Sequence, residues 1–324
     1  MVDNFGRKIE YMRVSITDRC DLRCRYCMPD GCEKVPMSHI LPYEEIIRIC
    51  RAAARLGISR IKITGGEPFV RLGCTDLMKK LKALDGIEEV TVTTNGQQLE
   101  NYIDELKDIG IDGINISLDT LDPGKFEYIT GRGHLEKTLL GIELAAASGI
   151  KTKINVLPQK VFNEDELADL AGLAGKYGID VRFIELMPVG AASAENGISN
   201  PDILKMLRER WPDLESDPET RGNGPAVYYK SKSLKGDIGF ISAMHGKFCE
   251  YCNRVRLTSQ GQLKPCLSYD SGTDLVPYLK GSDDELMEAL RGAIMKKPEA
   301  HCFDKTETDC DDHAEHRLMS QIGG

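Results

Sequence analysis

Three cysteines near the N-terminus have the spacing of a metal-binding loop. Cys20, Cys24 and Cys27 are separated by three and then two residues. In a straight helix, Cys20 and Cys27 would lie about 10 Å apart along the axis, too far for their thiolates to converge on one centre. We therefore expect a loop around an iron–sulfur cluster or a zinc ion, since soft thiolates suit both, with inert or redox-active thiols as the third interpretation. Three ligands leave one position open, as in reactive metal sites, unless Cys32 is the fourth.

A second set of three cysteines lies in the C-terminal part of the chain. Cys249 and Cys252 form a Cys-x-x-Cys pair, and thirteen residues separate Cys252 from Cys266. Residues 253–258 alternate between polar and apolar side chains, a turn follows, and residues 262–266 can return as the partner strand. Such a hairpin brings Cys266 back towards Cys252, so that three thiolates again meet without a clear fourth ligand.

Two arginines lie on the outgoing strand of this hairpin. Arg254 and Arg256 share one face, and Val255 and Leu257 share the other, because successive side chains of a strand alternate. Two guanidinium groups beside a metal site indicate a phosphate-bearing ligand. The simpler interpretation of the second cysteine set is a structural zinc site that is completed by a histidine such as His245.

Short β-branched segments alternate with longer amphipathic ones through the first 185 residues. The predicted strands are residues 13–16, 60–64, 89–94, 113–118, 151–157 and 180–184. The predicted helices are residues 43–56, 75–84, 102–109, 135–148 and 164–177. This alternation predicts parallel strands with helices packed outside. Six units are two short of a closed barrel, so we favour an open, partial (βα)6 TIM-like barrel over a doubly wound sheet.

Residues suited to chemistry follow three of these strands. The cysteine loop comes after the first strand, Gly65-Gly66-Glu67-Pro68 after the second and Thr94-Asn95-Gly96 after the third. In barrels of this kind, chemistry occurs at the carboxyl ends of the strands, so we expect these segments to meet. Two successive glycines let the backbone approach a ligand closely, although a tight turn explains the pair equally well.

Cationic residues lie in or beside predicted strands, where a barrel interior normally holds branched apolar side chains. They are Arg13, Arg60, Lys62, Lys153 and Arg182. Any one of them could point outwards, but as a group they indicate a site for negative charge.

The alternating pattern ends after Gly190. We therefore divide the chain into a barrel core of residues 1–190 and a C-terminal region of residues 191–324. The second part carries the second cysteine set and caps the barrel. Within it, residues 200–210 are typical of a helix and residues 213–224 of a loop.

Composition excludes several classes of protein. The chain has 324 residues and a formal net charge of -9, which argues against broad binding of nucleic acid. No stretch is apolar enough for a membrane span, and residues 1–11 are too polar for a signal peptide, so we expect a cytoplasmic protein. Eleven cysteines in such a chain favour metal or redox chemistry over a disulfide framework.

Four further cysteines show no partner pattern and are interpreted as core or surface thiols: Cys50, Cys74, Cys302 and Cys310. Three histidines are expected to face solvent: His301, His313 and His316. The pattern assigns no chemical role to either group.

The first half of the chain resembles the radical S-adenosylmethionine superfamily in Cys20-x-x-x-Cys24-x-Tyr26-Cys27 and Gly65-Gly66-Glu67-Pro68. The chain as a whole resembles the GTP 3′,8-cyclase family of molybdenum-cofactor biosynthesis. The added motifs are Cys249-x-x-Cys252-Asn253-Arg254-Val255-Arg256-Leu257, Cys266 and the terminal Gly323-Gly324. The resemblance runs from Arg13 to Gly324, and the joint occurrence of these motifs in this order is highly specific.

The resemblance implies two [4Fe-4S] clusters and S-adenosylmethionine as cofactors. The first cluster would be held by Cys20, Cys24 and Cys27, and the second by Cys249, Cys252 and Cys266. S-adenosylmethionine would contact positions matching Tyr26, Gly66, Ser117 and Met187. GTP would contact Arg13, Lys62, Thr93, Lys153, Arg182, Arg254, Val255 and Arg256, with its guanine on the second cluster. Catalytic roles would fall to Arg254, Arg256 and the tail Gly323-Gly324, which reaches into the active site.

Lys62 departs from the family pattern. Where the family often has Lys-x-Arg before Ile-Thr-Gly-Gly, this chain has Arg60-Ile61-Lys62. Lysine cannot form the bidentate fork of arginine, so a contact of Lys62 with GTP would differ from that of the family.

The implied reaction is a radical cyclisation by a lyase. An electron from the first cluster cleaves S-adenosylmethionine to methionine and a 5′-deoxyadenosyl radical, which takes the 3′ hydrogen of GTP. The sugar radical attacks C8 of guanine, giving 3′,8-cyclo-7,8-dihydro-GTP. The implied partners are an electron donor protein and the downstream cyclic pyranopterin monophosphate synthase, with a homodimer as a possible assembly and neither nucleic acid nor membrane as a partner.

Two alternatives remain open. The nearer one is a radical enzyme with an auxiliary cluster that modifies a peptide. Such enzymes usually carry more cysteines in the C-terminal part and have no use for Arg254 and Arg256. The other is a zinc-stabilised interaction protein, which would contain zinc and no iron.

Overall fold

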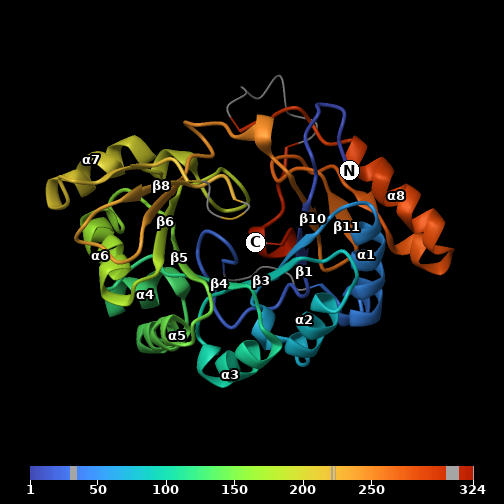
Figure 1. Ribbon diagram of the computed structural model, residues 1–324, viewed down its shortest axis with the longest axis horizontal. Helices are drawn as coiled ribbons and strands as arrows, with labels where there is room; N and C mark the ends of the chain where they lie inside the picture. The colour runs from blue at the N-terminus through green and yellow to red at the C-terminus, as the bar shows by residue number, and fades with distance from the viewer. Residues whose placement is uncertain (30–34, 220–221, 223, 304–313, 324) are drawn as a thin grey trace.

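The computed structural model describes residues 1–29, 35–219, 222, 224–303 and 314–323. Within these residues, twelve strands form one curved sheet in the order β12-β11-β10-β1-β2-β3-β4-β5-β6-β9-β8-β7. Figure 1 shows the helices outside the curve and the last described residues on its concave side. Four positions named above lie outside the described residues: Cys32, Cys310, His313 and Gly324.

Six parallel strands form the centre of the sheet. They are β1 (Tyr11–Ser15), β2 (Arg60–Thr64), β3 (Glu89–Thr94), β4 (Gly113–Ser117), β5 (Thr152–Val156) and β6 (Asp180–Ile184). Each pairs in parallel with the next in sequence order. The helices between them include α1 (Tyr43–Arg55), α2 (Cys74–Lys82), α3 (Leu99–Ile109), α5 (Leu135–Ala147) and α6 (Leu167–Tyr177). Predicted and observed bounds agree to within a few residues, and the open, partial barrel is confirmed.

The main core lies between the sheet and its helices. Met12 and Val14 on β1 are fully buried in this core, as is Ile63 on β2. Burying a side chain of this size contributes about 1.5–3 kcal/mol. Because successive side chains of a strand point to opposite faces, the alternate residues face the concave side. The outer face of the sheet is therefore apolar, and the inner face is left for chemistry.

The C-terminal part of the chain extends the sheet at both edges. At one edge lie β10 (Arg254–Leu257), β11 (Gln262–Lys264) and β12 (Thr273–Asp274). At the other edge lie β9 (Ile238–Ile241), β8 (Val227–Lys230) and β7 (Glu215–Asp217). β10 is parallel to β1 and β9 is parallel to β6, whereas the remaining pairs are antiparallel. The β10–β11 hairpin is the one predicted from the spacing of the second cysteine set.

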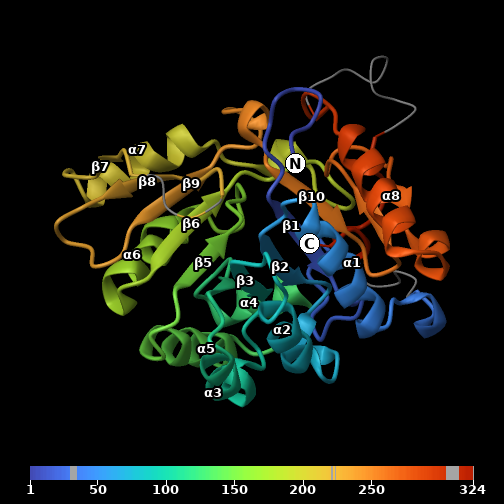
Figure 2. The same cartoon turned by 45° about the vertical axis from the view of Figure 1, so that its right-hand side comes forward.

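Several elements were not predicted from the sequence. They are α4 (Pro123–Thr130), α8 (Asp283–Met295) and the strands β7 to β9 and β12, whereas α7 (Asn200–Arg210) matches its prediction. The predicted loop 213–224 contains β7, a short edge strand whose pairing with β8 leaves no periodic pattern. Helix α8 begins at a capping box of Ser282 and Glu285 and packs beside α1 (Figure 2). In the part of the chain that the structure describes, no helix is long and apolar enough to span a bilayer.

Candidate active site

The concave side of the sheet encloses a cavity of about 410 Å³ that is lined by all six cysteines of the two motifs. The first set lies beyond the carboxyl end of β1. The second set lies at the opposite end, because Cys252 precedes β10, which is parallel to β1, and Cys266 follows the antiparallel β11. The expectation of chemistry at the carboxyl ends of the strands therefore covers only the first set.

The first cysteine set lies on a loop, as its spacing predicts. Main-chain hydrogen bonds from Arg23 and Arg25 hold this loop on the end of α4. The N–H group of Cys27 donates to the carbonyl of Cys24 at 2.9 Å, which turns the chain back on itself. Cys20, Cys24 and Cys27 therefore line the same cavity.

The surroundings of these thiols keep them protonated when no metal is bound. Burial raises the pKa of Cys20 to about 12, and the negative charge of Glu67 adds to the shift. Burial and the neighbouring cysteines raise the pKa of Cys24 well above its ordinary value. The positive charge of a bound metal would offset this effect and stabilise the thiolates. The loop fits an iron–sulfur cluster with one iron left open for another ligand.

Gly65 and Gly66 make close contact with the segment that leads into the cysteine loop. A Cβ atom at Gly66 would lie 2.2 Å from the carbonyl oxygen of Arg19, and one at Gly65 would lie 2.7 Å from that of Thr17. The N–H groups of Gly66 and Glu67 donate to the carbonyls of Thr17 and Arg19, both at 2.7 Å. The glycines are thus needed for the approach of two backbone segments, which a tight turn alone does not explain.

Glu67 joins the ends of β2 and β3. Its carboxylate accepts the N–H group of Phe69 at 3.2 Å, the hydroxyl of Thr94 at 2.8 Å and the N–H group of Asn95 at 2.7 Å. Burial raises the pKa of Glu67 to about 8. The side chain of Asn95 in turn donates to Asp21 in the cysteine loop at 2.7 Å. The segments that follow the first three strands therefore meet, as the strand order predicts.

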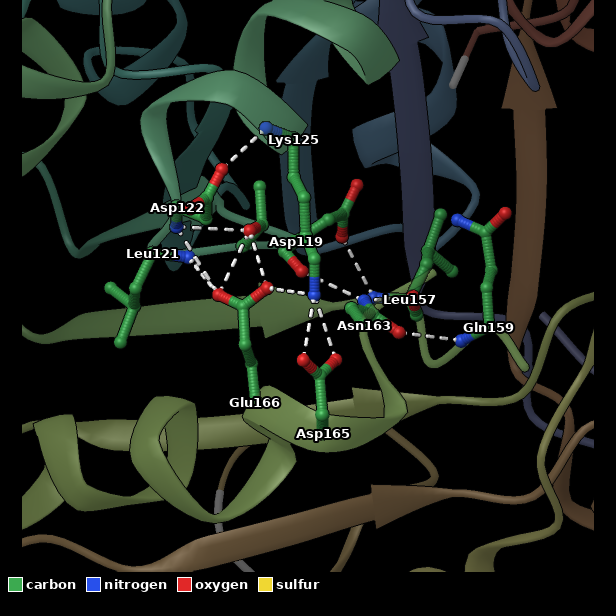
Figure 3. Close-up of polar contacts among 10 residues, drawn as sticks. Asp119, Leu121, Asp122, Lys125, Leu157, Gln159, Asn163, Asp165 and Glu166 are labelled. Carbon is green, nitrogen blue, oxygen red and sulfur yellow. Dashed lines mark hydrogen bonds and ion pairs between the residues drawn. The ribbon is translucent and has the colours of Figure 1, made fainter. Parts of the chain in front are cut away.

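Tyr26 is held by a carboxylate that was not predicted from the sequence. Its hydroxyl donates to Asp119 at 2.7 Å, and both side chains line the cavity. Asp119 also accepts the N–H group of Leu157 at 2.8 Å, and its main-chain carbonyl accepts the amide of Asn163 at 2.7 Å (Figure 3). Glu166 accepts hydrogen bonds from the residues that follow Asp119 (Figure 3). The loops after β4 and β5 together thus position Asp119 and, through it, Tyr26.

The second cysteine set is contacted by residues on both sides of α8 in the sequence. The sulfur of Cys249 accepts the N–H group of His301 at 3.4 Å, and that of Cys266 lies 3.4 Å from the hydroxyl of Ser268. His301 is 9% exposed and lines the cavity, so the expectation that it faces solvent is wrong. The side chain of His245, by contrast, is 64% exposed. Among the described residues, no three His, Cys, Asp or Glu side chains are close enough to hold a single metal ion.

Lys297 is a buried cation that was also not predicted. It is 3% exposed, and its ammonium group donates to the carbonyls of Arg254 and Pro265, both at 2.7 Å. Burial alone would raise the pKa of Cys252, but the positive charges of Lys297 and Arg254 outweigh it and lower this pKa to about 7. Lys297 therefore ties together the segments that carry the second cysteine set and favours a thiolate at Cys252.

Cations from five strands line the cavity between the two cysteine sets. They are Arg13, Lys62, Lys153, Arg182, Arg254 and Arg256. Arg13 is the direct neighbour of Arg256 in the register of β1 and β10, and of Lys62 in the register of β1 and β2. Burial and neighbouring positive charges lower the pKa of Lys62 and of Arg256 well below their ordinary values. Such a cluster is stabilised by an anion, so the cavity is suited to a strongly negative ligand.

Arg60 does not belong to this cluster. It lies at the amino end of β2, where its guanidinium is 3.6 Å from the carboxylate of Glu10 and 3.7 Å from that of Glu89. The expectation that all five strand cations serve one site is therefore wrong for Arg60, because acidic residues at the same end neutralise its charge.

Some buried polar atoms in the cavity lining have no hydrogen-bond partner among the described residues. They are Nε of Arg13, Nε of Arg254 and Oγ1 of Thr91. Leaving such an atom unsatisfied costs about 1–3 kcal/mol. A polar ligand in the cavity would satisfy these atoms.

The remaining predicted contact residues are not all equivalent. Those that line the cavity are Tyr26, Gly66, Thr93, Ser117 and Met187. Val255 is 1% exposed and packs into the core on the outer face of β10, so only its main chain could contact a ligand. The carbonyl of Gly323 lies 3.5 Å from Nη1 of Arg256, and Gly324 lies outside the described residues.

Comparison with known proteins identifies both halves of the chain. Residues 14–174 match the Radical SAM superfamily, and residues 179–303 match the family Molybdenum Cofactor Synthesis C. The GTP 3′,8-cyclase of Clostridium perfringens (strain SM101 / Type A) is 42% identical over 327 residues, which cover 100% of both chains. That of Rhizobium etli is 42% identical over 335 residues, which cover 100% of this chain and 94% of the relative. The chain belongs to the GTP 3′,8-cyclase family.

Solved structures share the fold of this GTP 3′,8-cyclase family member. Streptococcus suis SuiB bound to S-adenosylmethionine has a TM-score of 0.65 at 16% identity, covering 97% of this chain and 77% of that one. Native anSMEcpe with bound AdoMet has a TM-score of 0.58 at 14% identity, covering 94% and 88%. At such identities the likeness shows the fold alone. Membership in an enzyme family sets aside the zinc-stabilised interaction protein.

Proposed function

We propose that this chain is a GTP 3′,8-cyclase of molybdenum-cofactor biosynthesis that uses two [4Fe-4S] clusters and S-adenosylmethionine. The observation that supports it most directly is the single cavity, which joins two sets of three cysteines from opposite ends along a row of cations. The first cluster would be held by Cys20, Cys24 and Cys27, and the second by Cys249, Cys252 and Cys266.

The half of the cavity around the first cysteine set would bind S-adenosylmethionine. When bound, the first cluster supplies the electron that splits this molecule into methionine and a 5′-deoxyadenosyl radical. The contact residues would be Tyr26, Gly66, Ser117 and Met187. The protein keeps this half rigid, since Glu67 ties the strand ends together and Asp119 holds Tyr26. A rigid, enclosed site protects a reactive radical from water.

GTP would lie between the two cysteine sets. Its contacts would be Arg13, Lys62, Thr93, Lys153, Arg182, Arg254, Arg256 and the main chain of Val255, with the guanine at the second cluster. Arg182 is already oriented, because it donates to the side-chain oxygens of Asn115 and Asn155, both at 2.6 Å. Cations held in place in this way can orient the triphosphate without reorganising during the reaction. Removal of the 3′ hydrogen and closure of the bond from C3′ to C8 would leave a nucleotide radical, and uptake of one proton and of one electron from the electron donor protein would give 3′,8-cyclo-7,8-dihydro-GTP, an isomer of GTP.

The same function supports further proposals about the chain as a whole. Residues 1–190 would form the radical-generating core, and residues 191–324 would add the second cluster and the Gly323-Gly324 tail. An electron donor protein would reduce the first cluster, and a cyclic pyranopterin monophosphate synthase would consume the product. We further propose a cytoplasmic location and a homodimeric assembly.

The proposed function is tested under anaerobic conditions. Protein reconstituted with iron and sulfide is incubated with dithionite, S-adenosylmethionine and GTP, and mass spectrometry is used to detect 5′-deoxyadenosine and an isomer of GTP. We expect both to form together. Formation of 5′-deoxyadenosine with unchanged GTP would refute GTP as the substrate and would favour the peptide-modifying alternative.

Replacing Tyr26 with phenylalanine is expected to weaken the binding of S-adenosylmethionine. The change removes the donor to Asp119 and leaves a buried carboxylate oxygen unsatisfied, at a cost of about 1–3 kcal/mol, which loosens the loop. The measurement is equilibrium binding of S-adenosylmethionine to the cluster-loaded protein, with the more exposed Tyr278→Phe as the matched control. Equal affinity of Tyr26→Phe and the parent would show that Asp119 does not position the site.

Replacing Arg256 with alanine is expected to weaken GTP binding and to leave both clusters assembled. The change removes one cation from the cavity lining, and losing one partner of a desolvated cation–phosphate pair costs about 3 kcal/mol, or about a hundredfold in affinity. GTP affinity and iron content are measured together, and Arg291→Ala on the surface of α8 is the control. Undiminished affinity in Arg256→Ala would contradict the phosphate contact.

A further inference from the structure

The last described residues form a strap across the cavity. This C-terminal strap, residues 314–323, begins where Ala314 forms an antiparallel bridge with Tyr269. The N–H group of Glu315 then donates to the carbonyl of Ser268 at 3.0 Å. Ser268 follows Cys266 closely, so the strap starts beside the second cysteine set.

A buried ion cluster holds the start of the strap. The side chains of Lys264 and Glu315 are 0% and 1% exposed, and they form a direct ion pair. Arg317 adds a second cation, because its Nε and Nη2 atoms contact the two carboxylate oxygens of Glu315 at 2.9 and 2.8 Å. Lys264 also donates to the carbonyl of Tyr269. We call Lys264, Glu315 and Arg317 the strap anchor.

The strap anchor is connected to the substrate cations through the β10–β11 hairpin. Lys264 on β11 lies opposite Arg256 on β10 in the antiparallel register. Directly opposed residues of two antiparallel strands point to the same face, so two cations lie side by side there. Glu315 supplies the negative charge that lets Lys264 stay buried beside Arg256. The buried positive charge of Lys264 on this hairpin is therefore balanced by Glu315 only when the strap is docked.

The rest of the strap passes the loop after β6 and leads to Arg256. A Cβ atom at Gly190 would lie 3.1 Å from Cα of Leu318, so this glycine lets the strap pass close to the loop after β6. Ile322 is fully buried in a small apolar cluster with Val189 and Leu267. The chain then places the carbonyl of Gly323 at 3.5 Å from Nη1 of Arg256.

We propose that Glu315, through the strap anchor, is a positioning residue that sets how far the C-terminal tail reaches into the cavity. Because Glu315 is held at one point, the length of chain from Glu315 to Gly323 determines that Gly323 lies beside Arg256. The inference rests on the proposed function, since it assigns the tail a place in the same active site. It also predicts that the charge of Glu315 matters although this residue touches no reacting atom.

The experiment compares Glu315→Gln with the parent and with a matched control. Glutamine keeps the shape but removes the charge, so Lys264 is left as a buried cation without its carboxylate. Loss of one partner of a buried ion pair is expected to weaken docking of the strap by about a hundredfold. The control is Glu288→Gln on α8. The carboxylate of Glu288 is exposed and forms an ion pair with Arg291 on the surface of the same helix.

Two measurements are made on each full-length, cluster-loaded variant. One is the ratio of cyclised product to 5′-deoxyadenosine, which we expect to fall at least about tenfold in Glu315→Gln, with an unchanged iron content. The other is the rate at which a carboxypeptidase removes the terminal residues, which we expect to rise by a similar factor. Both should stay at the parental value in Glu288→Gln.

A double variant guards against a trivial loss of stability. Lys264→Met combined with Glu315→Gln leaves no buried, unpaired lysine, so its product ratio should lie closer to that of the parent than that of Glu315→Gln. A double variant as impaired as the single one would refute the charge pairing, and a parental ratio and digestion rate in Glu315→Gln would refute the anchor itself. If the parent makes no cyclised product, the proposed function fails, whereas the digestion rates still decide on the anchor.

Discussion

Gly66→Ala is expected to lose the first iron–sulfur cluster and to keep the second. The added Cβ atom would lie 2.2 Å from the carbonyl oxygen of Arg19 and 2.6 Å from its carbonyl carbon. Both are backbone atoms, so the clash cannot be relieved by a side-chain rotation. The segment that leads directly into Cys20 must therefore move, and Cys20 would no longer be held beside Cys24 and Cys27 in the cavity lining. We expect iron and sulfide content to fall to about half of the parental value, since one of two equal clusters is lost.

Further variants separate this effect from a general loss of stability. Gly65→Ala has a smaller overlap, with 2.7 Å to the carbonyl oxygen of Thr17, and should retain more of the first cluster than Gly66→Ala. Gly292→Ala lies within α8, where the added Cβ would meet no atom within 4 Å beyond its chain neighbours and the backbone of its own helix, and should be neutral or stabilising by up to about 1 kcal/mol. A full complement of iron in Gly66→Ala, with normal cleavage of S-adenosylmethionine, would contradict the role of this contact.

Lys297→Met is expected to have the opposite result, with the second cluster lost and the first retained. Methionine has a similar length but cannot donate to the carbonyls of Arg254 and Pro265. Two buried acceptors are then unsatisfied, at about 1–3 kcal/mol each. Cys252 also loses the charge that favours its thiolate. We expect about half of the parental iron, retained cleavage of S-adenosylmethionine and no cyclised product.

The neighbouring lysine provides the control for this variant. Lys296 is exposed, whereas Lys297 is buried, so Lys296→Met makes the same chemical change without removing a buried contact. It should keep both clusters and parental activity. If Lys297→Met also keeps the spectroscopic signature of both clusters, the hairpin does not need this lysine, and its burial has another cause.

The barrel could be predicted from the sequence because its signals are local. Each strand of the central sheet is a short β-branched segment, and each helix has an amphipathic pattern, so periodicity alone locates them. The β10–β11 hairpin was also predictable, since a turn within a short sequence separation fixes its register. The opposite faces of Arg256 and Val255 then follow from alternation, and the structure has them in the cavity and in the core.

The supporting residues could not be predicted in the same way. Lys297 and His301 lie in a segment without periodicity, and their contacts join residues that are distant in sequence. Asp119 lies two residues beyond Ser117, at the carboxyl end of β4, and this position could have marked it as a candidate. Arg60 was assigned to the wrong site because alternation gives the face of a strand but not the end of the barrel that a long side chain reaches.

The register between β1 and β10 has a consequence for which molecules can react. These strands are directly hydrogen-bonded, and the two cysteine sets lie beyond opposite ends of them. The five residues of β1 span about 13 Å at 3.3 Å per residue. The distance between the two cysteine sets is therefore set by the number of residues in these strands. It does not depend on how separate domains dock, because both strands belong to one sheet. A molecule shorter than this distance would reach only one of the two cysteine sets, so we expect the cavity to discriminate between molecules by their length.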